Sequence, residues 1–384
     1  MRVIGLISGT SADAIEAVLA EVSGAPPRLE QRVLAGRSVA IPEELRARIH
    51  AVAAGRGTAE AICLLDAELG ERFAQAALDV TAAAGLGVRD VALIGSHGQT
   101  IWHAVRADGS VAGTLQIGSA AVIAERTGVT TVSDLRSRDI AGGGQGAPLV
   151  AYVDWLLLRH ATRSRAVQNL GGIGNVAFLP PIADDDTPPV AFDTGPANVL
   201  IDIIMGLLTD GRQACDVDGA KAASGHVEEA WLEELLGLPY YAQSPPKTTG
   251  RELFSPAMGA SLLADGRRKG LAEADIVATL TALTGASIAD QYRRFLPHVP
   301  DEVIAAGGGT RNPALMAGLA ARLPDGVHLM TVDELGMASH QKEALAMAVL
   351  AHETWHGRTG SLPAFTGVRQ PVVLGSITPG RPTA

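Results

Sequence analysis

The sequence predicts an α/β protein whose short buried strands end in glycine-rich turns. Apolar runs of strand length occur at Arg2–Ile7, Arg165–Asn169 and Val303–Ala306, each followed by small or glycine residues. Helical spacing of apolar residues separates them, most clearly at Ile276–Phe295. Alternating strands and helices are typical of α/β folds, whose binding sites lie beyond the carboxyl ends of the strands. A chain of 384 residues has room for about two or three domains.

Composition and charge exclude several classes of protein. The formal net charge of −10, with no cluster of Lys and Arg among aromatic residues, argues against nucleic acid as a partner. No apolar run is long enough to cross a membrane, and Val3–Ile7 is too short for a signal peptide. We therefore expect a cytoplasmic protein without a membrane partner. Cys63 and Cys215 lie far apart in the sequence, so neither a disulfide framework nor a zinc ribbon is expected.

The first turn follows the first strand. Ser8–Ser11 consists of small and hydroxyl residues, which leave backbone amides free for an anion, although an ordinary hairpin turn is the simpler interpretation. The composition of Ala12–Val22 favours a helix, and a strand returning from the turn is the alternative. Pro42–Ala84 has helical spacing that is broken near Gly55–Gly57, which predicts two helices.

A polar segment follows the next predicted strand, Val88–Ile94. Gly95–His103 combines histidine, glutamine and hydroxyl side chains with a tryptophan, which we expect in a turn. Sugar hydroxyls need donors and acceptors, and the apolar face of a sugar ring packs on an aromatic side chain, so a sugar site is predicted here. A structural turn with a core histidine is the alternative.

Two other glycine patterns do not fit the standard nucleotide motifs. Gly142–Pro148 satisfies the relaxed form GxGxxA, but charged residues separate it from the preceding strand, Gly128–Ser133, and Pro148 occupies its end. We therefore do not expect a Rossmann turn there. No Gly-Lys pair occurs in the chain, which excludes a Walker lysine loop.

The most informative stretch is Val190–Asp202. Three apolar residues lead to Asp193, Thr194–Pro196 break the run, and helical spacing resumes at Asn198–Met205. A carboxylate at the end of a strand would lie at the edge of the sheet, where α/β enzymes carry their active sites. The alternative is that Asp193 caps the following helix.

Three glycine turns close predicted strands along the chain: the first turn, Asn169–Val176 and Gly307–Pro313. Together they could enclose a nucleotide, with backbone amides and a helix N-terminus holding its phosphates. A competing signal is the literal H-E-x-x-H at His352–His356, which on a helix could bind zinc. The following residues contain no Asp, Glu, His or Cys to complete such a site, so we expect a packing helix and no metal site.

Several of these stretches together resemble the anhydro-N-acetylmuramic acid kinase family, part of the actin-like sugar kinase superfamily. They run in family order over nearly the whole chain. The matching stretches are Ser8–Ser11, Ser96–His103, Gly143–Pro148, Asn169–Asn175, Phe192–Asp202, Thr249–Glu252, Gly307–Pro313, Glu343–Ala344 and Arg369–Gly375.

The resemblance implies a two-domain actin/hexokinase-like fold with duplicated ribonuclease H-like β/α cores and an interdomain cleft. Domain I would comprise residues 1–137 and 350–384, with the sugar site and the first phosphate turn, and domain II residues 138–349, with nucleotide binding and the catalytic Asp. It implies ATP-dependent hydrolytic opening of the 1,6-anhydro ring of 1,6-anhydro-N-acetylmuramic acid and phosphorylation at O6, giving N-acetylmuramic acid 6-phosphate and ADP for peptidoglycan recycling. A homodimer is also implied.

Site residues follow from the same resemblance. Asp193 would be the catalytic base, taking a proton from the water that attacks the anomeric carbon. Mg²⁺ would accompany ATP and neutralise phosphate charge. Expected sugar contacts are His97, Gln99, Trp102, Arg136, Gln145 and Glu343, with Arg136 suited to the lactyl carboxylate. Expected ATP contacts are Gly9, Thr10, Ser11, Ala12, Asp13, Ala14, Ile15, Glu16, Asn169, Gly171, Gly172, Gly307, Gly308, Gly309 and Asn312.

One departure from the family pattern lies in the first turn. The pattern S-G-T-S-x-D-G-x-D here carries Ala14 in place of its second glycine, which a positive φ would require, and Glu16 in place of its last aspartate. The departure motivates one alternative, a non-catalytic nucleotide- or sugar-binding sensor on the same fold. A kinase for another anhydro sugar, one without the lactyl group, is a second alternative, against which Arg136 speaks. A zinc hydrolase at His352 and His356 is a third alternative.

Overall fold

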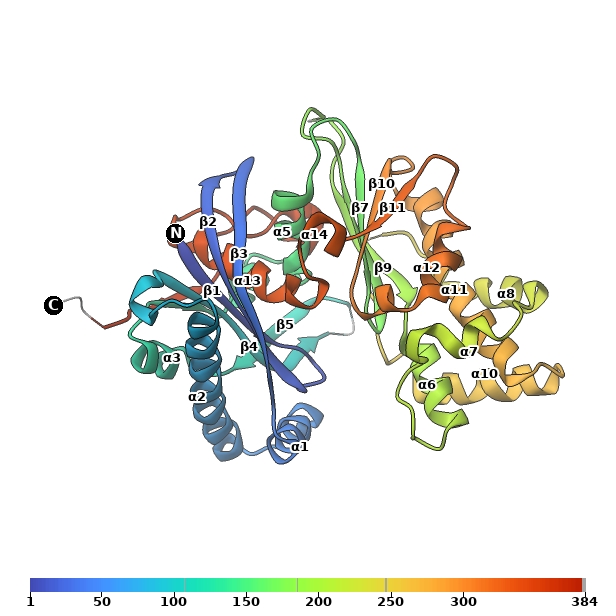
Figure 1. Ribbon diagram of the computed structural model, residues 1–384, viewed down its shortest axis with the longest axis horizontal. Coiled ribbons are helices and arrows are strands. Elements are labelled where there is room, and N and C mark those ends of the chain that lie inside the picture. Colours follow the sequence, from blue (N-terminus) through green and yellow to red (C-terminus); the bar gives the residue numbers. More distant parts are fainter. Residues whose placement is uncertain (107, 185, 246, 382–384) are drawn as a thin grey trace. The chain divides into compact units, whose positions relative to one another are not determined.

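The chain is an α/β protein with two separate sheets, as a computed structural model shows for residues 1–106, 108–184, 186–245 and 247–381 (Figure 1). It forms two compact units. Unit 1 comprises Met1–Leu157 and His340–Ala384, and unit 2 comprises Leu158–Ser339. The division expected from the sequence placed these boundaries at 137/138 and 349/350. The later boundary precedes the whole of helix α13 (Lys342–Trp355), because this helix packs on strands of unit 1.

Unit 1 consists of a mixed sheet with helices on its faces. Its strands are β1 (Arg2–Ser8), β2 (Ala14–Ala25), β3 (Arg28–Ala40), β4 (Leu93–Val105), β5 (Val111–Ile117), β6 (Thr131–Ser133) and β12 (Ser376–Thr378). Its helices are α1 (Glu43–Ala51), α2 (Ala59–Ala83), α3 (Ala120–Thr127), α4 (Ser137–Ala141), α5 (Leu149–Leu158), α13 and α14 (Pro363–Thr366). Shorter helical turns are η1 (Val52–Arg56), η2 (Val88–Asp90) and η6 (Ser339–Gln341).

Unit 2 has a smaller sheet and a larger share of helix. Its strands are β7 (Arg165–Leu170), β8 (Ile173–Leu179), β9 (Val190–Pro196), β10 (Glu302–Ala306) and β11 (His328–Thr331). Its helices are α6 (Val199–Leu208), α7 (Ala220–Ala223), α8 (Glu229–Leu236), α9 (Pro239–Ala242), α10 (Pro256–Arg268), α11 (Glu273–Phe295) and α12 (Pro313–Ala320). The turns are η3 (Val217–Gly219), η4 (Gly308–Arg311) and η5 (Asp333–Leu335).

The two sheets repeat one topology. Neighbouring strands run in the order β3-β2-β1-β4-β6 in unit 1 and β9-β8-β7-β10-β11 in unit 2. Within each of these sets of five, the first three strands in sequence are antiparallel, and the other two run parallel to the first. The unit 1 sheet has two more strands, β5 and β12, which pair antiparallel with β4 and β6. This repeated order confirms the duplicated ribonuclease H-like cores that the family resemblance implies.

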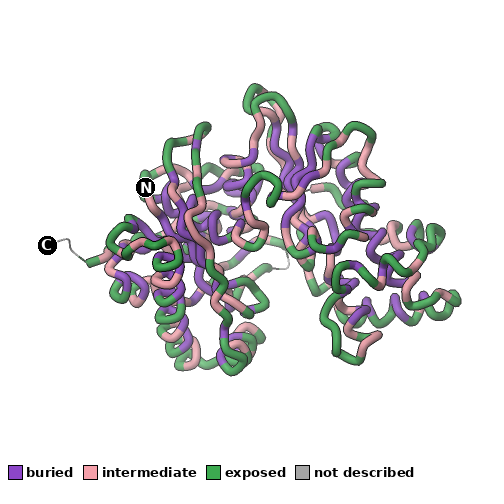
Figure 2. The backbone as a smooth tube through the Cα atoms, viewed as in Figure 1, coloured by how far each residue is buried: buried purple, intermediate pink, exposed green. Residues whose placement is uncertain are grey.

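Both faces of β1 are buried, which explains its continuous apolar sequence. Ile4 and Leu6 belong to the core cluster that includes residues of α1 and α2. On the opposite face α13 comes so close that a Cβ at Gly5 would lie 1.8 Å from the carbonyl oxygen of Ala344. Gly95 on β4 has the same role, because its Cβ would lie 2.3 Å from the carbonyl oxygen of Met347. Figure 2 shows the buried strands between exposed helix surfaces.

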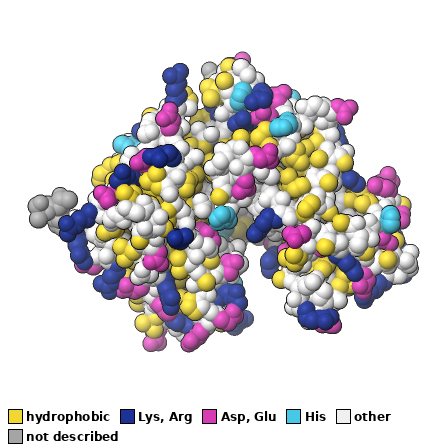
Figure 3. Space-filling view, viewed as in Figure 1, with side chains coloured by type: hydrophobic (Ala, Val, Ile, Leu, Met, Phe, Trp, Pro, Cys, Tyr) yellow, Lys and Arg dark blue, Asp and Glu magenta, His cyan; other side chains and the backbone are white. Residues whose placement is uncertain are grey.

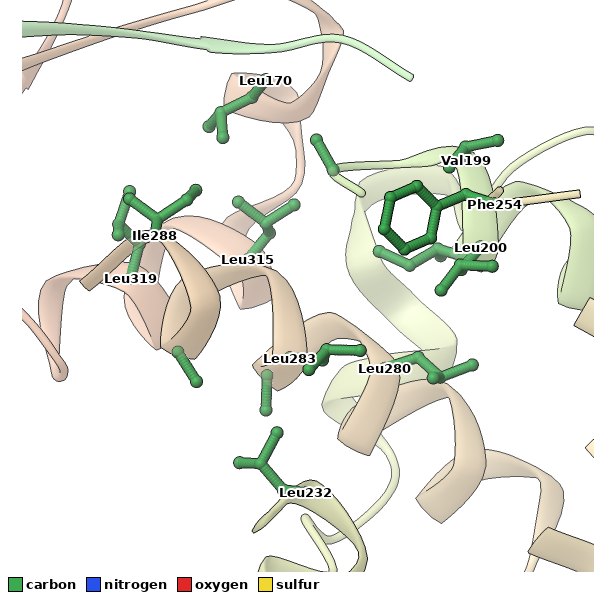
Figure 4. Packing of buried hydrophobic residues seen from close by; sticks show 14 of the residues in the cluster. Leu170, Val199, Leu200, Leu232, Phe254, Leu280, Leu283, Ile288, Leu315 and Leu319 are labelled. Carbon is green, nitrogen blue, oxygen red and sulfur yellow. The ribbon is translucent and has the colours of Figure 1, made fainter. Parts of the chain in front are cut away.

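The core of unit 2 lies between its sheet and helices α6, α11 and α12. Leu170, Val199, Leu200, Leu283 and Leu315 are all buried and belong to one cluster (Figure 4). Helix α11 is the central element, since its residues from Ile276 to Ala289 are almost all buried. It contacts α6, α7, α8, α12 and β9. The cluster therefore fixes the start of α6, which follows the strand that carries Asp193.

Three predicted elements need correction. Residues 14–25 form strand β2, which is the alternative named above and what the family resemblance implies, and not the helix that propensity favours. Pairing with β1 and β3 outweighs the local preference. The polar segment Gly95–His103 is not a turn; it lies within β4, where Gln99–Val105 pair with β5. Asp193 is not at the end of its strand, because β9 continues to Pro196.

Most other predicted elements agree with the structure, but the strand expected at Val88–Ile94 begins only at Leu93, because Val88–Asp90 form the helical turn η2, where the Asp90 carboxylate accepts from the N–H of Gly87. The helix before the Gly55 break and the helix after it are α1 and α2, and Gly55 itself has φ +74°. The strands at Arg165–Asn169 and Val303–Ala306 and the helix at Ile276–Phe295 are present with bounds shifted by a few residues at most. Charged side chains of both signs are interspersed over the face seen in Figure 3. Among the described residues, no helix combines the length and apolar character needed to cross a membrane.

Candidate active site

Asp193 lies in β9, the strand at one edge of the unit 2 sheet. Its cross-strand partner is Asn175 on β8, next to a register shift between Gly174 and Asn175. Because β9 is an edge strand, its outer side offers backbone groups to a segment outside the sheet. Tyr240 and Lys247, from the segment that follows α8, use those groups.

This segment holds Asp193 by three hydrogen bonds. The backbone N–H of Asp193 donates to the carbonyl of Lys247 at 3.1 Å. The hydroxyl of Tyr240 donates to the carbonyl of Asp193 at 2.7 Å. The N–H of Thr249 donates to carboxylate oxygen Oδ2 at 2.9 Å. The other carboxylate oxygen, Oδ1, receives no hydrogen bond from any described residue, so it is available to a substrate or a water molecule. Asp193 therefore does not cap the following helix, which begins after Asn198.

The surroundings favour a proton-accepting carboxylate. Burial raises the pKa of Asp193 to about 6, opposed by the Thr249 hydrogen bond, while Glu252 raises it further and Lys247 lowers it. A carboxylate with this pKa is ionised near pH 7 and is a stronger base than an exposed one. The side chain is partly buried, so it is shielded from bulk water without being closed off.

The second glycine turn joins β7 to β8. The carbonyls of Gly171 and Gly172 accept hydrogen bonds from the N–H groups of Asn198 and Val199 at the start of α6, each at 3.0 Å. The Asn198 side chain also donates to the carbonyls of Leu170 and Gly171. The N–H groups of both glycines donate to no acceptor within the described part of the chain. A Cβ at Gly172 would meet only Val199, at 4.0 Å, so packing does not require glycine there.

The third glycine turn joins β10 to α12. Gly307 has φ +92°, and its Cβ would lie 2.6 Å from Oδ1 of Asn169, so the second and third turns are in contact. Asn312 is the N-cap of α12, where its Oδ1 accepts from the N–H of Leu315 at 3.0 Å, and Pro313 follows at the first helical position. A Cβ at Gly308 would meet only the tip of Arg311, at 4.0 Å.

A cavity of about 370 Å³ opens in unit 2 near these turns. It is lined by the end of α6 and by η3 and α7, including Met205, Leu208, Asp216, Val217 and Lys221. The η3 turn contacts the third glycine turn, because a Cβ at Gly219 would lie 2.2 Å from Oδ1 of Asn312. Asp216 organises the turn by accepting from the N–H groups of Lys221 and Ala222.

In unit 1 the predicted sugar contacts Arg136 and His97 form a hydrogen-bonded pair. Nε of Arg136 donates to Nε2 of His97 at 2.8 Å, and NH1 of Arg136 donates to the carbonyl of Gly146 at 2.6 Å. Burial, and then the charge of Arg136, lower the pKa of His97 to about 3. The imidazole is therefore neutral at any physiological pH, with its Nδ1 3.1 Å from the carbonyl of Gly98. Glu343 lies near enough to act electrostatically on Arg136.

Gln99 ties β4 to the first glycine turn. It is 1% exposed; its Oε1 accepts from Oγ of Ser8 at 2.6 Å, and its Nε2 donates to the carbonyl of Gly9 at 3.1 Å. Gly9, Thr10 and Ser11 are exposed, and no described atom lies within 4 Å of a Cβ placed on Gly9. Packing does not require glycine there either, which leaves room for a ligand against the backbone.

Asp139 shapes the loop that carries Gln145. It is fully buried; its Oδ2 accepts from the N–H of Gly146 at 2.7 Å and its Oδ1 from the hydroxyl of Thr366 at 2.7 Å. The N–H of Gln145 itself donates to the carbonyl of Thr366. The half-buried Gln145 side chain therefore lies on a loop that is fixed from both sides.

Comparison with known proteins identifies the family. The family model described as anhydro-N-acetylmuramic acid kinase matches residues 1–380. Relatives of that name include one from Microcystis aeruginosa, 44% identical over 98% of this chain and 100% of the relative. Another, from Streptomyces avermitilis, is 48% identical over 99% of this chain and 95% of the relative. The chain belongs to the anhydro-N-acetylmuramic acid kinase family.

Solved structures with a distant likeness cover most of the chain. One is the activator of the 2-hydroxyisocaproyl-CoA dehydratase from Clostridium difficile with bound ADPNP, with TM-score 0.45, 13% identity, and coverage of 92% of this chain and 95% of that one. Another is a ROK family glucokinase from Streptomyces griseus with glucose and AMPPNP, with TM-score 0.39, 16% identity, and coverage of 92% and 100%.

The departure from the family pattern in the first turn does not force the backbone at Ala14. That residue begins β2 opposite Ala40, and the positive φ in the turn, 50°, belongs to Ala12 instead. The expectation that position 14 requires glycine for its φ is therefore wrong. Glu16 accepts from the hydroxyl of Ser38 at 2.6 Å through Oε1, while its Oε2 is buried without a described partner.

Other expected ligand residues have different surroundings. Trp102 is 51% exposed and pairs across the strands with Leu115, and His103 bonds the hydroxyl of Thr114. Ala12 and Ile15 are buried in the core of unit 1, so only their backbone could meet a nucleotide. Contact of the predicted residues with sugar or ATP stays a prediction.

The H-E-x-x-H segment is a packing feature of α13. One oxygen of Glu353 bonds His352 at 2.9 Å, and both its oxygens accept from Arg358. Because Glu353 is fully buried and both of its oxygens are paired, it is not free to act as the base of a zinc site. Within the described ranges, no group of His, Cys, Asp and Glu is arranged to hold a metal ion.

The sequence did not indicate the residues that hold Asp193. Tyr240, Lys247 and Thr249 are about 50 residues further along the chain, and only Thr249 lies in a stretch that matches the family. The sequence does hold one signal: Tyr240 and Tyr241 precede Lys247 in the chain. Two adjacent aromatic residues indicate that this segment is at least partly buried.

Proposed function

We propose that this chain opens the 1,6-anhydro ring of 1,6-anhydro-N-acetylmuramic acid with water and transfers the γ-phosphoryl group of ATP to O6, giving N-acetylmuramic acid 6-phosphate and ADP. Membership of the family, at 42–48% identity to relatives named for this activity over nearly their whole length, supports the kinase. It does not favour the non-catalytic sensor or a kinase for another sugar.

Asp193 is our candidate for the base that starts the reaction. Oδ1 would accept a proton from the water that attacks C1, while Thr249 holds Oδ2. As the C1–O bond breaks, the released O6 attacks the γ-phosphorus and ADP leaves; the proton on Asp193 passes to solvent at the end of the cycle. The free Oδ1 on a carboxylate with a pKa of about 6 is the observation that supports this role.

The nucleotide would be held mainly by backbone groups. In unit 2, the free N–H groups of Gly171 and Gly172 and the open face of Gly308 fit phosphate oxygens. In unit 1, the exposed turn at Gly9–Ser11 leaves room for a ligand against its backbone. The cavity beside η3 offers apolar and polar surface for the base and ribose. Mg²⁺ bound to the phosphates would neutralise their charge, and we assign no protein side chain to it.

The sugar half of the site would be built on Arg136. Its guanidinium, fixed by His97 and Gly146, suits the lactyl carboxylate of the substrate. Glu343, exposed and close to Arg136, would meet the sugar hydroxyls. His97 and Gln99, which are buried, would act by holding Arg136 and the first turn rather than through large contact areas.

The decisive experiment measures ADP release from Mg·ATP and 1,6-anhydro-N-acetylmuramic acid by the wild type and by Asp193→Asn. We expect turnover in the wild type and a loss of at least about 1,000-fold in the variant, with ATP affinity retained. No turnover in a folded wild type that binds ATP would contradict the function. Full activity in Asp193→Asn would contradict the role of Asp193.

A stability control belongs to the same experiment. Because the folded state raises the pKa of Asp193, the protonated carboxyl is preferred in the fold, and this contribution is lost as the pH rises through about 6. At pH 7.5 the neutral amide of Asp193→Asn should therefore leave the protein at least as stable as the wild type. Thermal unfolding of both proteins at pH 7.5 checks that lost activity is not lost structure.

We also propose a cytoplasmic homodimer. A kinase that consumes ATP needs the nucleotide pool of the cytoplasm, and the dimer follows from the family resemblance alone. Light scattering coupled to size exclusion measures the mass of the particle. A mass near 79 kDa, about twice that of the 39.6 kDa chain, is expected, and the mass of a single chain would contradict the dimer.

A further inference from the structure

A buried lysine lies against the backbone of the segment that holds Asp193. Lys247 is 6% exposed, and its carbonyl accepts the N–H of Asp193 at 3.1 Å. Two residues later, the N–H of Thr249 donates to Oδ2 of Asp193. The position of Lys247 therefore sets where both of these hydrogen bonds lie.

The ammonium group of Lys247 sits among three aromatic rings. Nζ lies 4.7 Å from the centre of the Phe295 ring, 4.8 Å from that of Tyr240 and 5.7 Å from that of Phe192. A cation within about 6 Å of a ring centre is attracted by the ring, more strongly when both are shielded from water. The three rings come from α11, α9 and β9, so the ammonium joins three elements.

Two oxygen atoms complete the surroundings of the ammonium. Nζ donates to Oε1 of Gln291 on α11 and, at 3.4 Å, to the carbonyl of Tyr240. Gln291 is fully buried, and its Nε2 donates to the carbonyl of Tyr241, which fixes its orientation. Tyr240 itself donates its hydroxyl to the carbonyl of Asp193. The lysine, the tyrosine and the aspartate thus form one connected group.

We propose that Lys247 is a positioning residue for the base: its ammonium, held by the aromatic rings of Phe295, Tyr240 and Phe192 and by Gln291, fixes the 247–249 segment so that Thr249 orients the Asp193 carboxylate. This proposal rests on the function of Asp193 proposed above. No part of it requires Lys247 to touch either substrate.

Electrostatics gives the same residue a second effect. The charge of Lys247 lowers the pKa of Asp193, against the larger effect of burial. Burial and Arg294 in turn lower the pKa of Lys247 to about 8, while Asp290 and Asp193 raise it. The lysine is therefore still mostly protonated at neutral pH, and its removal should make the Asp193 carboxyl harder to ionise.

The test replaces Lys247 by Met, which fills a similar volume without charge, and by Arg, which keeps the charge. For Lys247→Met we expect kcat to fall about 10- to 100-fold, the penalty of an ångström-scale misplacement, with both KM values within about twofold. The acid limb of the kcat–pH profile should move toward higher pH. Lys247→Arg should recover part of kcat and restore the acid limb.

A readout without turnover separates this proposal from the function. Hydrogen–deuterium exchange of the peptide that contains Thr249 should accelerate in Lys247→Met and stay near the wild-type rate in Lys247→Arg. If the wild type does not turn over the sugar but exchange responds in this way, the anchoring stands and the function fails. Unchanged exchange and an unchanged acid limb in a folded Lys247→Met would overturn the proposal.

Two further variants control for charge and for folding. Lys269→Met removes the same charge from the surface of unit 2, where Lys269 pairs with Glu234, and should change neither kcat nor exchange of the Thr249 peptide. If Lys247→Met does not fold, Phe295→Leu removes the nearest ring and keeps the lysine. It should give the same changes at reduced size, and no change in either readout would overturn the proposal.

Discussion

The carboxylate of Asp193 keeps one oxygen free to act as a base, and its protonation should be visible in the pH dependence of catalysis. Because burial raises its pKa to about 6, protonation removes the base at a pH that is easily reached. We expect kcat to fall about tenfold per unit below pH 6 and to level off near pH 7. A kcat that is constant between pH 5 and 7 would contradict this assignment.

The γ-phosphate of ATP also titrates near pH 6, so the nucleotide needs its own measurement. ATP affinity determined over the same pH range identifies any contribution from the phosphate. A change in kcat with no matching change in affinity points to the enzyme.

A second prediction at the level of residues concerns His97 and Arg136. His97→Ala removes the acceptor for Nε of Arg136, and a hydrogen bond to a charged group contributes about 1.5–3 kcal/mol. We expect the KM for the sugar to rise about tenfold or more, with the KM for ATP unchanged, in steady-state kinetics.

The variant His97→Gln distinguishes the loss of the hydrogen-bond acceptor from the loss of the imidazole ring. Its carbonyl can still accept from Arg136, so His97→Gln should recover much of the sugar affinity. His328→Ala, which removes an exposed histidine from β11 in unit 2, should behave as the wild type. Equal sugar affinity in His97→Ala and the wild type would show that Arg136 needs no support.

Because the second and third glycine turns are in contact, alanine substitution should reduce stability more at Gly307 than at Gly326. A Cβ at Gly307 meets both a positive φ and the side chain of Asn169, whereas Gly326, with φ +89°, has no described atom within 4 Å of its Cβ. Gly326→Ala should therefore cost only about 1 kcal/mol of unfolding free energy. Gly307→Ala should cost more, about 1–3 kcal/mol from strain and displacement of the turn, and should weaken ATP binding.

Denaturant unfolding and ATP titration measure the two effects separately. The matched φ of the two glycines means that the difference in unfolding free energy reports the contacts of Gly307 with Asn169 and with the backbone of Leu170. If both variants lose the same stability and bind ATP equally, the contact between the turns has no importance for the nucleotide.

The elements show where sequence reasoning succeeds. The spacing of apolar residues correctly predicted α11, α13 and the break at Gly55, because the signals for these features lie in residues close together in the sequence. Helix propensity gave the wrong secondary structure for residues 14–25, because their pairing with β1 and β3 depends on tertiary contacts. The segment at Gly95–His103 was expected to be a turn because it is polar, yet it lies within β4, where Gln99–His103 pair with β5.

The candidate site divides in the same way. The family motifs drew attention to Asp193, Arg136 and the glycine turns, whose residues are contiguous in the sequence. They gave no sign of Lys247, because its aromatic neighbours come from three separated segments. Nor did they show that His97 supports Arg136, since this pair joins residues almost 40 positions apart.

The division of the molecule into two units predicts that one unit can fold on its own and the other cannot. Residues 158–339 contain the complete unit 2, its sheet and its core. Residues 1–157 lack α13, whose residues from Ala344 to Thr354 are buried, and lack β12, which pairs with β6. We expect the 158–339 fragment to unfold cooperatively on its own and the 1–157 fragment to remain unfolded.

Circular dichroism with thermal melting distinguishes the two fragments. Supplying residues 340–384 together with 1–157 should restore a cooperative transition, because the segment fills the face of β1 and β4 left open at Gly5 and Gly95. A cooperative transition of 1–157 alone would show that α13 is dispensable for unit 1.

The position of α13 near the end of the chain also sets an order of events during synthesis. The ribosome makes strands β1 to β6 of unit 1 first, but the helix that covers one face of β1 emerges only after residue 342 (Figure 1). Unit 2 is complete by residue 339 and can fold while residues 1–157 still lack α13. The half of the protein that is translated first is thus finished last, and until α13 has been made the face of β1 at Gly5 lacks the helix that covers it.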